Sequence, residues 1–439
     1  MNNNQEELMQ KIVSLCKRRG FVYPNSEIYG GLANSWDYGP LGAELNNNVK
    51  QIWWKHFIQD REDMVGIDGG VILNPKVWEA SGHVKNFKDP LVECKKCHHR
   101  FRPDKLKDAS KCPDCGGKFT KAKMFSGMFK TTIGPVEEEG LTAYLRPETA
   151  QNMFVNFKNI LDSTNKKIPF GIGQMGKSFR NEITAGNFIF RTLEFEIMEI
   201  EYFIAPDANW KKIFEDWLKS IYQYADKLGL GKKNFYNHEI PARDRAFYSK
   251  RTIDLEYKYP WGLDELWAIA YRTNYDLNCH QKCSGQSLEY FDDVKHAKYI
   301  PHVIEPTFGV DRTMLALLVE SYTEEKVKGG DTRTVLKFKP SVAPYKIAVF
   351  PLLANKKELV KKAREIYDIL KNEYLCFWDD RGNIGKRYRY QDEIGTPYCI
   401  TVDFDTLKDK AVTVRDRDTM QQERIIIVKL TEYFQNKLK

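Results

Sequence analysis

The sequence lacks the features of a membrane or secreted protein. No apolar run approaches the roughly 20 residues that a membrane-spanning helix needs. The N-terminal segment MNNNQEEL does not have the basic and then apolar layout of a signal peptide. Low-complexity tracts and internal repeats are also missing, while 42% of the residues are apolar and 13% are aromatic, as is typical of folded domains. We therefore expect a cytoplasmic protein of two or three domains with no membrane partner.

The common catalytic motifs are absent as well. The chain has no glycine-rich phosphate loop of either usual type, no G-x-S-x-G nucleophile and no H-E-x-x-H helix. Positive charge is only in small excess, with 68 Lys and Arg against 60 Asp and Glu and a net charge of +8. This balance permits a nucleic-acid partner without requiring one, because most of the charges form a mixed surface.

Four of the nine cysteines form two closely spaced pairs. Cys94-x2-Cys97 and Cys112-x2-Cys115 are separated by fourteen residues. An odd total without a secretory signal argues against a disulfide framework, whereas two C-x-x-C turns can surround one tetrahedral Zn²⁺. Four thiolates complete its coordination, so we predict a structural zinc site; reduced thiols without a metal are the alternative. The pairs lie in a basic segment at about 90–120, which resembles an insertion.

Hydrophobic periodicity predicts the elements of the larger, N-terminal part. Apolar residues at helical spacing indicate amphipathic helices at 5–20 and 41–58, and Pro147 occupies a position typical of a first helical turn. The run 192–204 alternates side chains with a period of two, which indicates a long strand with two distinct faces. From 142 to 320, strand-like runs alternate with helical ones.

A second domain is expected after a boundary near 330–344, where glycine, proline and charged residues are mixed. Beyond it come a short strand, an amphipathic helix at 356–373 and two further strands. Two more strand-like runs then precede a terminal helix. This alternation predicts a separate α/β domain of about 100 residues.

Arginines and glutamates stand out on the predicted strands. Phe179-Arg180-Asn181-Glu182 ends one strand, the segment 190–195 (FRTLEF) begins the next, and Gly309-Val310-Asp311-Arg312 opens a helix. These segments resemble the strand–loop–strand and strand–helix motifs of class II aminoacyl-tRNA synthetases. In that class an earlier motif of helix and strand ends in a proline and forms the dimer interface; here it corresponds to the segment ending at Asn74-Pro75. Longer strings resemble the glycyl-tRNA synthetases in particular: GPLGAELNNNVKQIWW, NPKVWEASGH, RPETAQ, FRNEI, EPTFGVDR, GNIGKRYRYQDEIGTP and VTVRDRDTMQQER.

The resemblance implies an α+β fold. A class II catalytic domain is expected at 1–335, with an antiparallel sheet flanked by helices and with the zinc-knuckle insertion, and an α/β anticodon-binding domain is expected at 341–439. The resemblance also implies a homodimer that acts as a glycine–tRNA ligase. Glycine and ATP, with Mg²⁺, would first give glycyl-adenylate and pyrophosphate, and the glycine would then be transferred to the 3′ end of tRNA-Gly.

The resemblance also assigns roles in ATP binding and catalysis. Arg180 is expected to bind the α-phosphate and the glycine carboxylate, and Arg312 the γ-phosphate. Phe195 is expected to stack on adenine, and Glu182 to read the edge of the base. Because the attacking carboxylate is already an anion, positioning and charge neutralisation suffice, and Arg180, Glu182 and Arg312 are the expected catalytic residues. The implied ATP-binding set is Arg180, Asn181, Glu182, Phe190, Arg191, Thr192, Leu193, Glu194, Phe195, Glu265, Leu266, Gly309, Val310, Asp311 and Arg312.

Glycine offers no side chain to bind, so its selection must come from filled space. The family surrounds the ammonium group with carboxylates, and the matching residues are Glu148 and Glu199, with Thr307 nearby. Glu305 is the expected Mg²⁺ ligand, because a hard cation prefers carboxylate oxygen. The implied glycine-binding set is Arg102, Glu148, Phe195, Glu196, Ile197, Met198, Glu199, Glu305, Pro306, Thr307, Phe308 and Gly309. Thr307, Ile197 and Asn274 replace the serine, glutamine and aspartate usual in the family, which affects the shape of the pocket.

Each of these residues also has a simpler interpretation when taken alone. Arg180 and Arg191 could be exposed strand arginines paired with nearby glutamates. Glu199 and the other glutamates of its strand could be solvated, and Glu148 could stabilise the first turn of a helix. The segment 381–390 alternates cations with aromatics, which suits single-stranded RNA but also a solvated loop.

Two other functions compete with the ligase. A synthetase-like binding protein that has lost aminoacylation would have lost the ATP-binding arginines, yet Arg180 and Arg312 are present. A zinc-dependent hydrolase would need an open metal site with histidine or carboxylate ligands, whereas four paired cysteines close the coordination shell.

Overall fold

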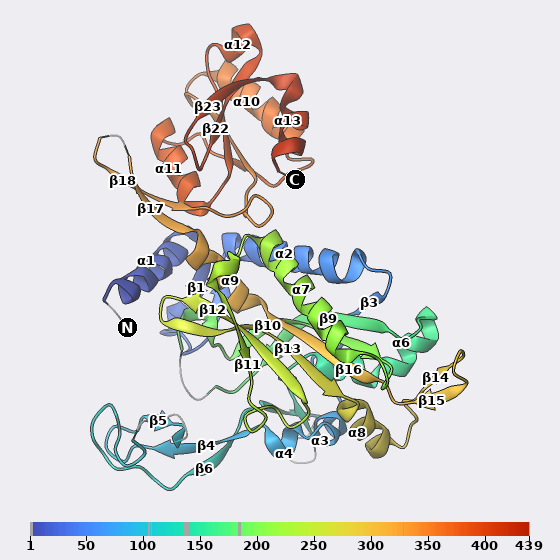
Figure 1. Ribbon diagram of the computed structural model, residues 1–439. Coiled ribbons are helices and arrows are strands. Elements are labelled where there is room, and N and C mark those ends of the chain that lie inside the picture. Colours follow the sequence, from blue (N-terminus) through green and yellow to red (C-terminus); the bar gives the residue numbers. More distant parts are fainter. Residues whose placement is uncertain are drawn as a thin grey trace.

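The computed structural model describes residues 3–103, 106, 108–135, 140–182, 186–327 and 329–438. The chain forms a large unit built on a seven-stranded sheet and a smaller C-terminal unit built on a five-stranded sheet (Figure 1). The smaller unit lies next to the N-terminal helix α1 (Asn3–Arg19), at one end of the large unit. Helix α1 matches the helix expected at 5–20, and the mixed fold expected from the sequence is confirmed.

The seven-stranded sheet is the framework of the large unit. In spatial order its strands are β11 (Phe235–Glu239), β12 (Arg251–Tyr259), β13 (Gly262–Thr273), β16 (His302–Gly309), β10 (Glu194–Ile204), β9 (Phe170–Phe179) and β3 (Met64–Ile67). Within the described residues its pairings are antiparallel, except that β3 runs parallel to β9. Glu199 of β10 pairs with Gln174 of β9 and with Thr307 of β16, so side chains form rows across the three strands.

Three long helices cover one face of this sheet: α2 (Pro40–Trp54), which a π-helical turn at Lys55–Gln59 extends, α7 (Trp210–Leu228) and α9 (Val310–Ser321). Trp53, Phe57 and Phe308 meet at the centre of the interface, with ring centroids 5.1, 5.7 and 6.1 Å apart. All three are fully buried, and each such side chain stabilises the fold by about 1.5–3 kcal/mol. This core holds in place the sheet on which the candidate site lies.

Shorter helices lie on the opposite face, which bears the candidate site: α3 (Pro75–Ala80), α4 (His83–Asn86), α5 (Ala150–Val155), α6 (Phe157–Thr164) and α8 (Tyr275–Ser284). The expected helix start at Pro147 is wrong, because α5 begins after Thr149. The carbonyl of Pro147 instead accepts a hydrogen bond from Arg180, and the Thr149 hydroxyl, which could have capped α5, donates to Glu199. Glu148 therefore lies ahead of the helix, and its interpretation as a residue of the first helical turn is also wrong.

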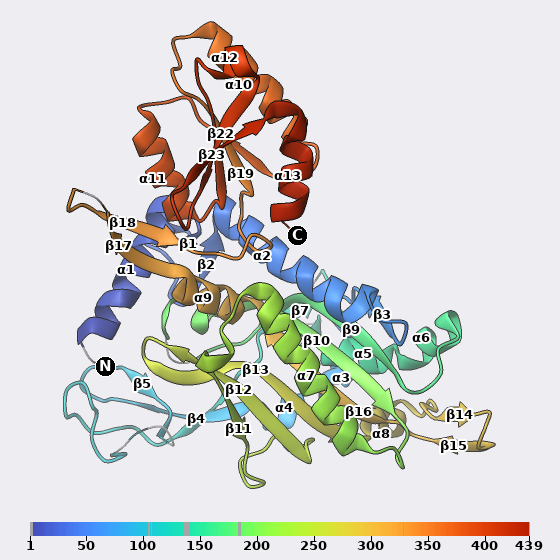
Figure 2. The same ribbon diagram turned by 45° about the horizontal axis from the view of Figure 1, so that its top comes forward.

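Small sheets accompany the seven-stranded sheet, and some of them, such as the hairpin at 290–299, extend away from the large unit (Figures 1 and 2). They consist of β1 (Val22–Pro24) with β2 (Trp36–Tyr38), β4 (Lys88–Glu93) with β5 (Arg100–Phe101) and β6 (Lys123–Ser126), β7 (Lys130–Ile133) with β8 (Leu141–Tyr144), β14 (Tyr290–Asp292) with β15 (Ala297–Tyr299), and β17 (Tyr322–Lys326) with β18 (Thr332–Leu336). The sheet β5-β4-β6 belongs to the inserted module that carries the paired cysteines. The hairpin β17–β18 leads from α9 to the C-terminal unit.

The C-terminal sheet has the spatial order β20-β19-β21-β22-β23. Its strands are β19 (Ile347–Pro351), β20 (Cys376–Trp378), β21 (Tyr398–Val402), β22 (Ala411–Asp416) and β23 (Gln422–Ile426). Helices α10 (Lys357–Leu370) and α13 (Leu430–Lys437) pack on one face, α11 (Ile384–Ile394) packs on the other, and α12 (Thr406–Asp409) follows β21. The sequence prediction missed α11 and treated its first half as a loop. Its buried side is largely polar, with Arg387, Gln391 and Asp392 beside Ile394, so apolar periodicity could not reveal it.

A buried ion cluster joins the C-terminal unit to the hairpin β17–β18. Asp392 of α11 accepts hydrogen bonds from Arg333 of β18 at 3.0 Å and from Arg415 of β22 at 2.8 and 3.0 Å. Removing one partner of a buried ion pair leaves an uncompensated charge at a cost of about 3–5 kcal/mol, so the pairing of each of these side chains depends on the other two. Both ribbon views show these two elements side by side (Figures 1 and 2). Among the described residues, none of the helices combines the length and the apolar character needed to cross a bilayer.

Candidate active site and metal site

A pocket opens on the site-bearing face of the large sheet, close to the start of α9. The end of β9, the segment entering β10, the strand β13 and the first turn of α9 form its walls. Its cavity volume is about 110 Å³, and the space beyond it opens to solvent. It is lined by Arg180, Glu182, Ile189, Phe190, Arg191, Thr192, Phe195, Ile197, Glu265, Leu266, Trp267, Thr307, Gly309, Asp311 and Arg312. The fold thus brings most of the residues expected to bind ATP around one space.

Arg180 follows directly after β9, and several contacts hold it at the pocket wall. Its backbone N–H donates to the carbonyl of Leu193 at 2.9 Å, and its Nε donates to the carbonyl of Pro147 at 3.1 Å. The guanidinium lies 5.2 Å from the centroid of the Phe195 ring, within the range of a cation–π contact. The side chain is therefore positioned without a ligand, which lowers the entropy cost of binding an anion there.

Arg312 approaches the pocket from the first turn of α9. Its Nη1 donates to the Glu265 carbonyl at 2.9 Å and lies 3.0 Å from the Glu265 carboxylate, and its guanidinium lies 4.4 Å from the centroid of Phe190. Arg191 is more exposed and has a longer contact, 3.5 Å, with Glu182. At the back of the pocket, burial raises the pKa of Asp311 to about 6. The pocket thus carries three arginines, a charge suited to a polyphosphate.

A second group of polar side chains lies deeper on the same face. Glu199 accepts hydrogen bonds from both the N–H and the hydroxyl of Thr149, each 2.6 Å long. Glu148 accepts a hydrogen bond from Gln151 at 2.9 Å, and its other oxygen lies 3.2 Å from Nε2 of His83. Both glutamates are buried. Two of the carboxylates expected to bind glycine therefore share one protected environment.

Arg272 at the end of β13 supplies positive charge to this group. It is fully buried and donates to both oxygens of Asp276 at 2.8 Å and to Glu305 at 2.7 Å. Sequence reasoning missed Arg272 and Asp276. The available signal was a lone arginine at the end of the apolar run LWAIAYR. Glu305 is engaged by this guanidinium and does not line the pocket described above, so its role as a Mg²⁺ ligand stays a prediction.

Glu201 is fully buried on the same face of β10, and neither of its carboxylate oxygens has a hydrogen-bond partner among the described residues. Burial raises the pKa of Glu201 well above its ordinary value, and the nearby Glu305 raises it further. Burial likewise raises the pKa of Glu199, and that of Glu305 to about 8. The interpretation of the strand's glutamates as solvated is therefore wrong for Glu199 and Glu201, although Glu194 is exposed.

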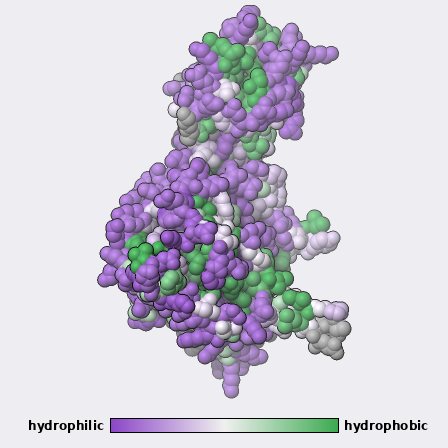
Figure 3. Space-filling model, turned by 90° about the vertical axis from the view of Figure 1, so that its right-hand side faces the viewer, coloured by the Kyte–Doolittle hydropathy of each residue, from purple (hydrophilic) through white to green (hydrophobic). Residues whose placement is uncertain are grey.

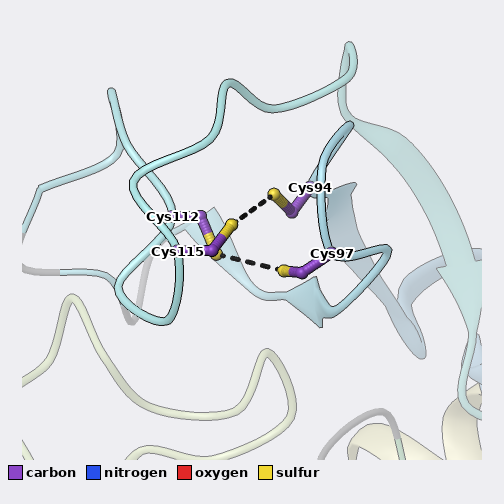
Figure 4. A group of neighbouring side chains, drawn as sticks. All are labelled: Cys94, Cys97, Cys112 and Cys115. Carbon is purple, nitrogen blue, oxygen red and sulfur yellow. Dashed lines mark hydrogen bonds between the residues drawn. The ribbon is translucent and has the colours of Figure 1, made fainter.

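The four paired cysteines converge in the inserted module (Figure 4). Their sulfur atoms all lie within 4.8 Å of one another, with the closest pairs, Cys94–Cys115 and Cys97–Cys112, at 3.4 and 3.6 Å. These distances far exceed the S–S bond of about 2.05 Å and are near the edge of about 3.8 Å of a tetrahedron with Zn–S bonds of about 2.3 Å. Backbone N–H groups of the first C-x-x-C turn lower the pKa of the Cys94 thiol to about 6, whereas desolvation and hydrogen bonds with the neighbouring cysteines raise the pKa of Cys97 to about 12. The cluster can hold a metal ion.

Comparison with known proteins bears directly on this arrangement. Residues 129–322 match the core domain of class II tRNA synthetases (G, H, P, S and T), and residues 346–437 match an anticodon-binding domain. The chain is 51% identical to the glycine–tRNA ligase of Lachnospira eligens, covering 99% of this chain and 100% of that protein. It is 50% identical to that of Clostridium acetobutylicum and 51% identical to that of Thermobifida fusca, covering 99% of both chains in each case. The chain belongs to the glycine–tRNA ligase family. The resemblance inferred from the sequence motifs is thereby confirmed.

Membership of the glycine–tRNA ligase family makes the chain an aminoacyl-tRNA synthetase, and the class II match covers the strands that carry the pocket. Several residues expected in the site nevertheless point away from it. Glu196 lies on the opposite face of β10 and binds Lys50 at 2.9 Å and Asn46 at 2.6 Å. Met198 and Phe308 are buried in the core beneath the long helices. These three residues can offer only their backbone to a ligand on the site-bearing face.

Two charged residues of the expected set have partners outside the pocket. Glu194 binds Lys177 across the β9–β10 pair. Arg102 lies in the inserted module, where it donates to Asp89 of β4 at 2.8 Å. Asn274, one of the departures from the family pattern, precedes the first turn of α8. The glycine-binding role of Arg102 stays a prediction.

The buried carboxyl of Glu201 should make the stability of this protein depend on pH. Because its pKa is raised in the folded state, Glu201 keeps its proton above pH 4.5 while the unfolded chain loses it. The free energy of unfolding should therefore fall with rising pH, by up to about 1.4 kcal/mol per pH unit for this one group. Glu201→Gln removes this contribution, so the stability of the variant relative to that of the wild type should increase as the pH rises. The thermal midpoints of the wild type and of the variant at pH 5.5, 7 and 8.5 check this. If the two midpoints differed by the same amount at all three pH values, Glu201 would be ionised in the folded protein.

Proposed function

We propose that this chain activates glycine with ATP and transfers it to the 3′ end of tRNA-Gly. The observation that carries the proposal is the order of side chains on one face of β10. Phe195, Ile197 and Glu199 lead from the nucleotide pocket to the buried carboxylates. Four residues along a strand span about 13 Å, so an adenine on Phe195 and an ammonium group near Glu199 can belong to one extended glycyl-adenylate.

In the first step a glycine carboxylate oxygen attacks the α-phosphorus of ATP. A new P–O bond forms to glycine while the bond to pyrophosphate breaks. Arg180 neutralises the glycine carboxylate and the α-phosphate, and Arg312 holds the γ-phosphate, since a planar guanidinium forms paired hydrogen bonds with both kinds of anion. Mg²⁺ bound with ATP neutralises further phosphate charge. The nucleophile is an anion from the start, so the site needs no general base.

Selection of glycine rests on the buried carboxylates. Glu148 and Glu199 bind the ammonium group and occupy the space that a methyl group would need. Thr307 stands beside Glu199 in the register of β10 and β16, so its own methyl group narrows the same space. A penalty of about 4–5 kcal/mol against alanine already gives a preference above a thousandfold. In the second step the 3′-hydroxyl of the terminal adenosine attacks the activated carbonyl and AMP leaves.

We propose that the four-cysteine cluster binds one structural Zn²⁺. Cys94, Cys97, Cys112 and Cys115 would hold it, and it would supply folding energy to the inserted module by joining two turns. Purified protein should then contain about one zinc per chain by elemental analysis, and Cys112→Ser should lose most of it, because three thiolates and a serine bind zinc far more weakly. Cys283→Ser, an exposed cysteine outside the cluster, is the matched control. A chain that folds and acts normally without zinc would contradict the assignment.

The C-terminal unit, residues 341–439, is proposed to bind the anticodon, and the preceding part, residues 1–335, to carry catalysis. A hollow at the start of α11 is lined by Arg381, Lys386, Arg389 and Tyr390, which suits phosphates and unstacked bases. Arg387 is buried instead and donates to backbone carbonyls around it, so it shapes this surface from inside. We place the reaction in the cytoplasm, where tRNA, ATP and glycine occur together.

We also propose that the chain is a homodimer. Ile28 and Tyr29 are 88% and 86% exposed, and Ile72, in the first class II motif, is 49% exposed, with Ile133 and Leu141 exposed on the neighbouring hairpin. In the view of Figure 3 hydrophilic residues predominate on both units, and hydrophobic patches are visible on each of them. Exposed apolar groups of this extent are typical of interaction surfaces.

Sedimentation analysis at micromolar concentration should therefore find a dimer. Replacing Ile28 and Tyr29 together by aspartate should shift it toward the monomer, because two charges would be buried without partners. Val428→Asp, at a comparably exposed apolar residue of the C-terminal unit, should not. A wild-type chain that stays monomeric would contradict the dimer proposal without affecting the catalytic proposal.

The catalytic proposal is tested by amino-acid-dependent exchange of pyrophosphate into ATP, measured with each of the twenty amino acids and without tRNA. We expect exchange with glycine alone, followed by glycine transfer to a tRNA-Gly transcript. Absence of exchange from folded, zinc-replete protein would favour a binding protein that has kept the fold without the chemistry.

A further inference from the structure

The string Ser81-Gly82-His83 belongs to a sequence motif that the catalytic roles above do not use. Ser81 follows α3, and His83 begins α4 after a sharp turn at Gly82. Gly82 has φ of 84°, a conformation that side chains other than glycine adopt only with strain. The turn directs His83 into the interior, where it is 5% exposed. A buried histidine must find partners for its polar ring nitrogens, because burying them without hydrogen bonds is costly.

His83 connects Ser81 to Glu148 through its two ring nitrogens. Nδ1 lies 2.8 Å from the Ser81 hydroxyl, and Nε2 lies 3.2 Å from Oε2 of Glu148. A carboxylate can only accept, so the proton on this side belongs to Nε2. The Ser81 hydroxyl fixes the ring from the other side. The three residues form a chain of hydrogen bonds that ends on one oxygen of Glu148.

The other oxygen of Glu148 is held as firmly from the opposite direction. Gln151 donates to Oε1 at 2.9 Å, and the amide oxygen of Gln151 lies 2.7 Å from Nε2 of His280 on α8. Each carboxylate oxygen can accept more than one hydrogen bond, so both retain capacity toward a ligand. Glu148 is thus clamped at two points while its acceptor sites remain available.

Glu148 differs from the other acids of the group in that His83 and Gln151 contact both of its oxygens. Glu305 and Asp276 are engaged by the guanidinium of Arg272, and Glu199 by Thr149. Burial by itself would raise the pKa of Glu148, but His83, Arg272 and Gln151 together hold it below its ordinary value. The pKa values of Glu199 and Glu305 are raised. Glu148 is therefore the acid of this group best kept as a carboxylate.

We propose that His83 is a positioning residue of the glycine pocket, which orients Glu148 toward the ammonium group of glycine through the chain Ser81–His83–Glu148. This inference rests on the proposed function, because it concerns how that site binds glycine. It predicts that changes at His83 affect the binding of glycine and leave the binding of ATP largely unchanged. The reason is that Ser81, His83 and Glu148 do not line the nucleotide pocket.

Two conservative replacements distinguish the roles of the two ring nitrogens of His83. In His83→Gln the side-chain amide can take the place of Nε2 and still donate to Glu148. In His83→Asn it can replace only Nδ1, which leaves Glu148 without this donor. Losing one hydrogen bond to a buried charged group corresponds to about a tenfold or larger effect. His83→Asn should therefore raise KM for glycine in pyrophosphate exchange by about tenfold or more, and His83→Gln by no more than about threefold.

Ser81→Ala is a milder second variant that keeps the imidazole. It should raise KM for glycine in the same direction by a smaller factor, with KM for ATP and the thermal midpoint close to those of the wild type. Equal losses in His83→Asn and His83→Gln, or a parallel rise of KM for ATP, would overturn the positioning role. If the wild type itself shows no glycine-dependent exchange, the proposed function fails instead, so the two failures are distinguishable.

Discussion

Arg180→Ala should lower kcat for glycine-dependent pyrophosphate exchange by about a thousandfold or more. The guanidinium is held beside Phe195 and the Pro147 carbonyl. In the proposed reaction the attacking carboxylate and the α-phosphate meet at this guanidinium. Negative charge there is greatest in the transition state, so the loss should appear mainly in kcat. Losses of 10³ to 10⁵ are typical when an arginine that stabilises phosphoryl transfer is removed.

The matched control for this experiment is Arg191→Ala. Arg191 lines the same pocket but is 42% exposed and has only the 3.5 Å contact with Glu182, so its loss should cost about tenfold or less. Arg180→Lys keeps the charge but not the planar fork and should fall between the two. Burst kinetics of adenylate formation separate chemistry from product release. An Arg180→Ala enzyme within about tenfold of the wild type would show that this arginine is only part of the scaffold.

Glu199→Gln should raise KM for glycine by about a hundredfold while KM for ATP changes by less than about threefold. The glutamine carbonyl can still accept from Thr149, so the local packing is kept. What is lost is the carboxylate that binds the ammonium group in the proposed reaction, and a charged hydrogen bond in such a site contributes about 1.5–3 kcal/mol. Initial rates of pyrophosphate exchange, measured over a range of each substrate, give both constants.

Glu196→Gln serves as the control on the same strand. Its side chain lies on the opposite face of β10 with Lys50 and Asn46, so both constants should stay near those of the wild type. Equal losses for glycine and ATP in Glu199→Gln would mean that the residue supports the fold without selecting the amino acid.

The family, the reaction class, the paired cysteines and the order of the two units followed from the sequence because their signals are local. F-R-x-E, the Gly-Val-Asp-Arg turn and the C-x-x-C pairs are short strings whose spacing carries the chemistry. The alternation of 192–204 likewise predicts β10 correctly, since strand formation depends on neighbouring residues. Helix α11 could not be predicted from the local pattern, because charged and polar residues occupy the side that it buries.

The tertiary structure alone decided which of these charged residues are buried and which neighbours they meet. Glu194, Glu199 and Glu201 share one strand, yet the first is exposed and the other two are enclosed by segments distant in the chain. The contact of Glu199 with Thr149 spans 50 positions, and that of Arg272 with Glu305 spans 33. Burial, pairing and the resulting pKa shifts depend on such long-range packing, and no local pattern encodes them. The clamp on Glu148 depends on the convergence of α4, α5 and α8, which supply His83, Gln151 and His280.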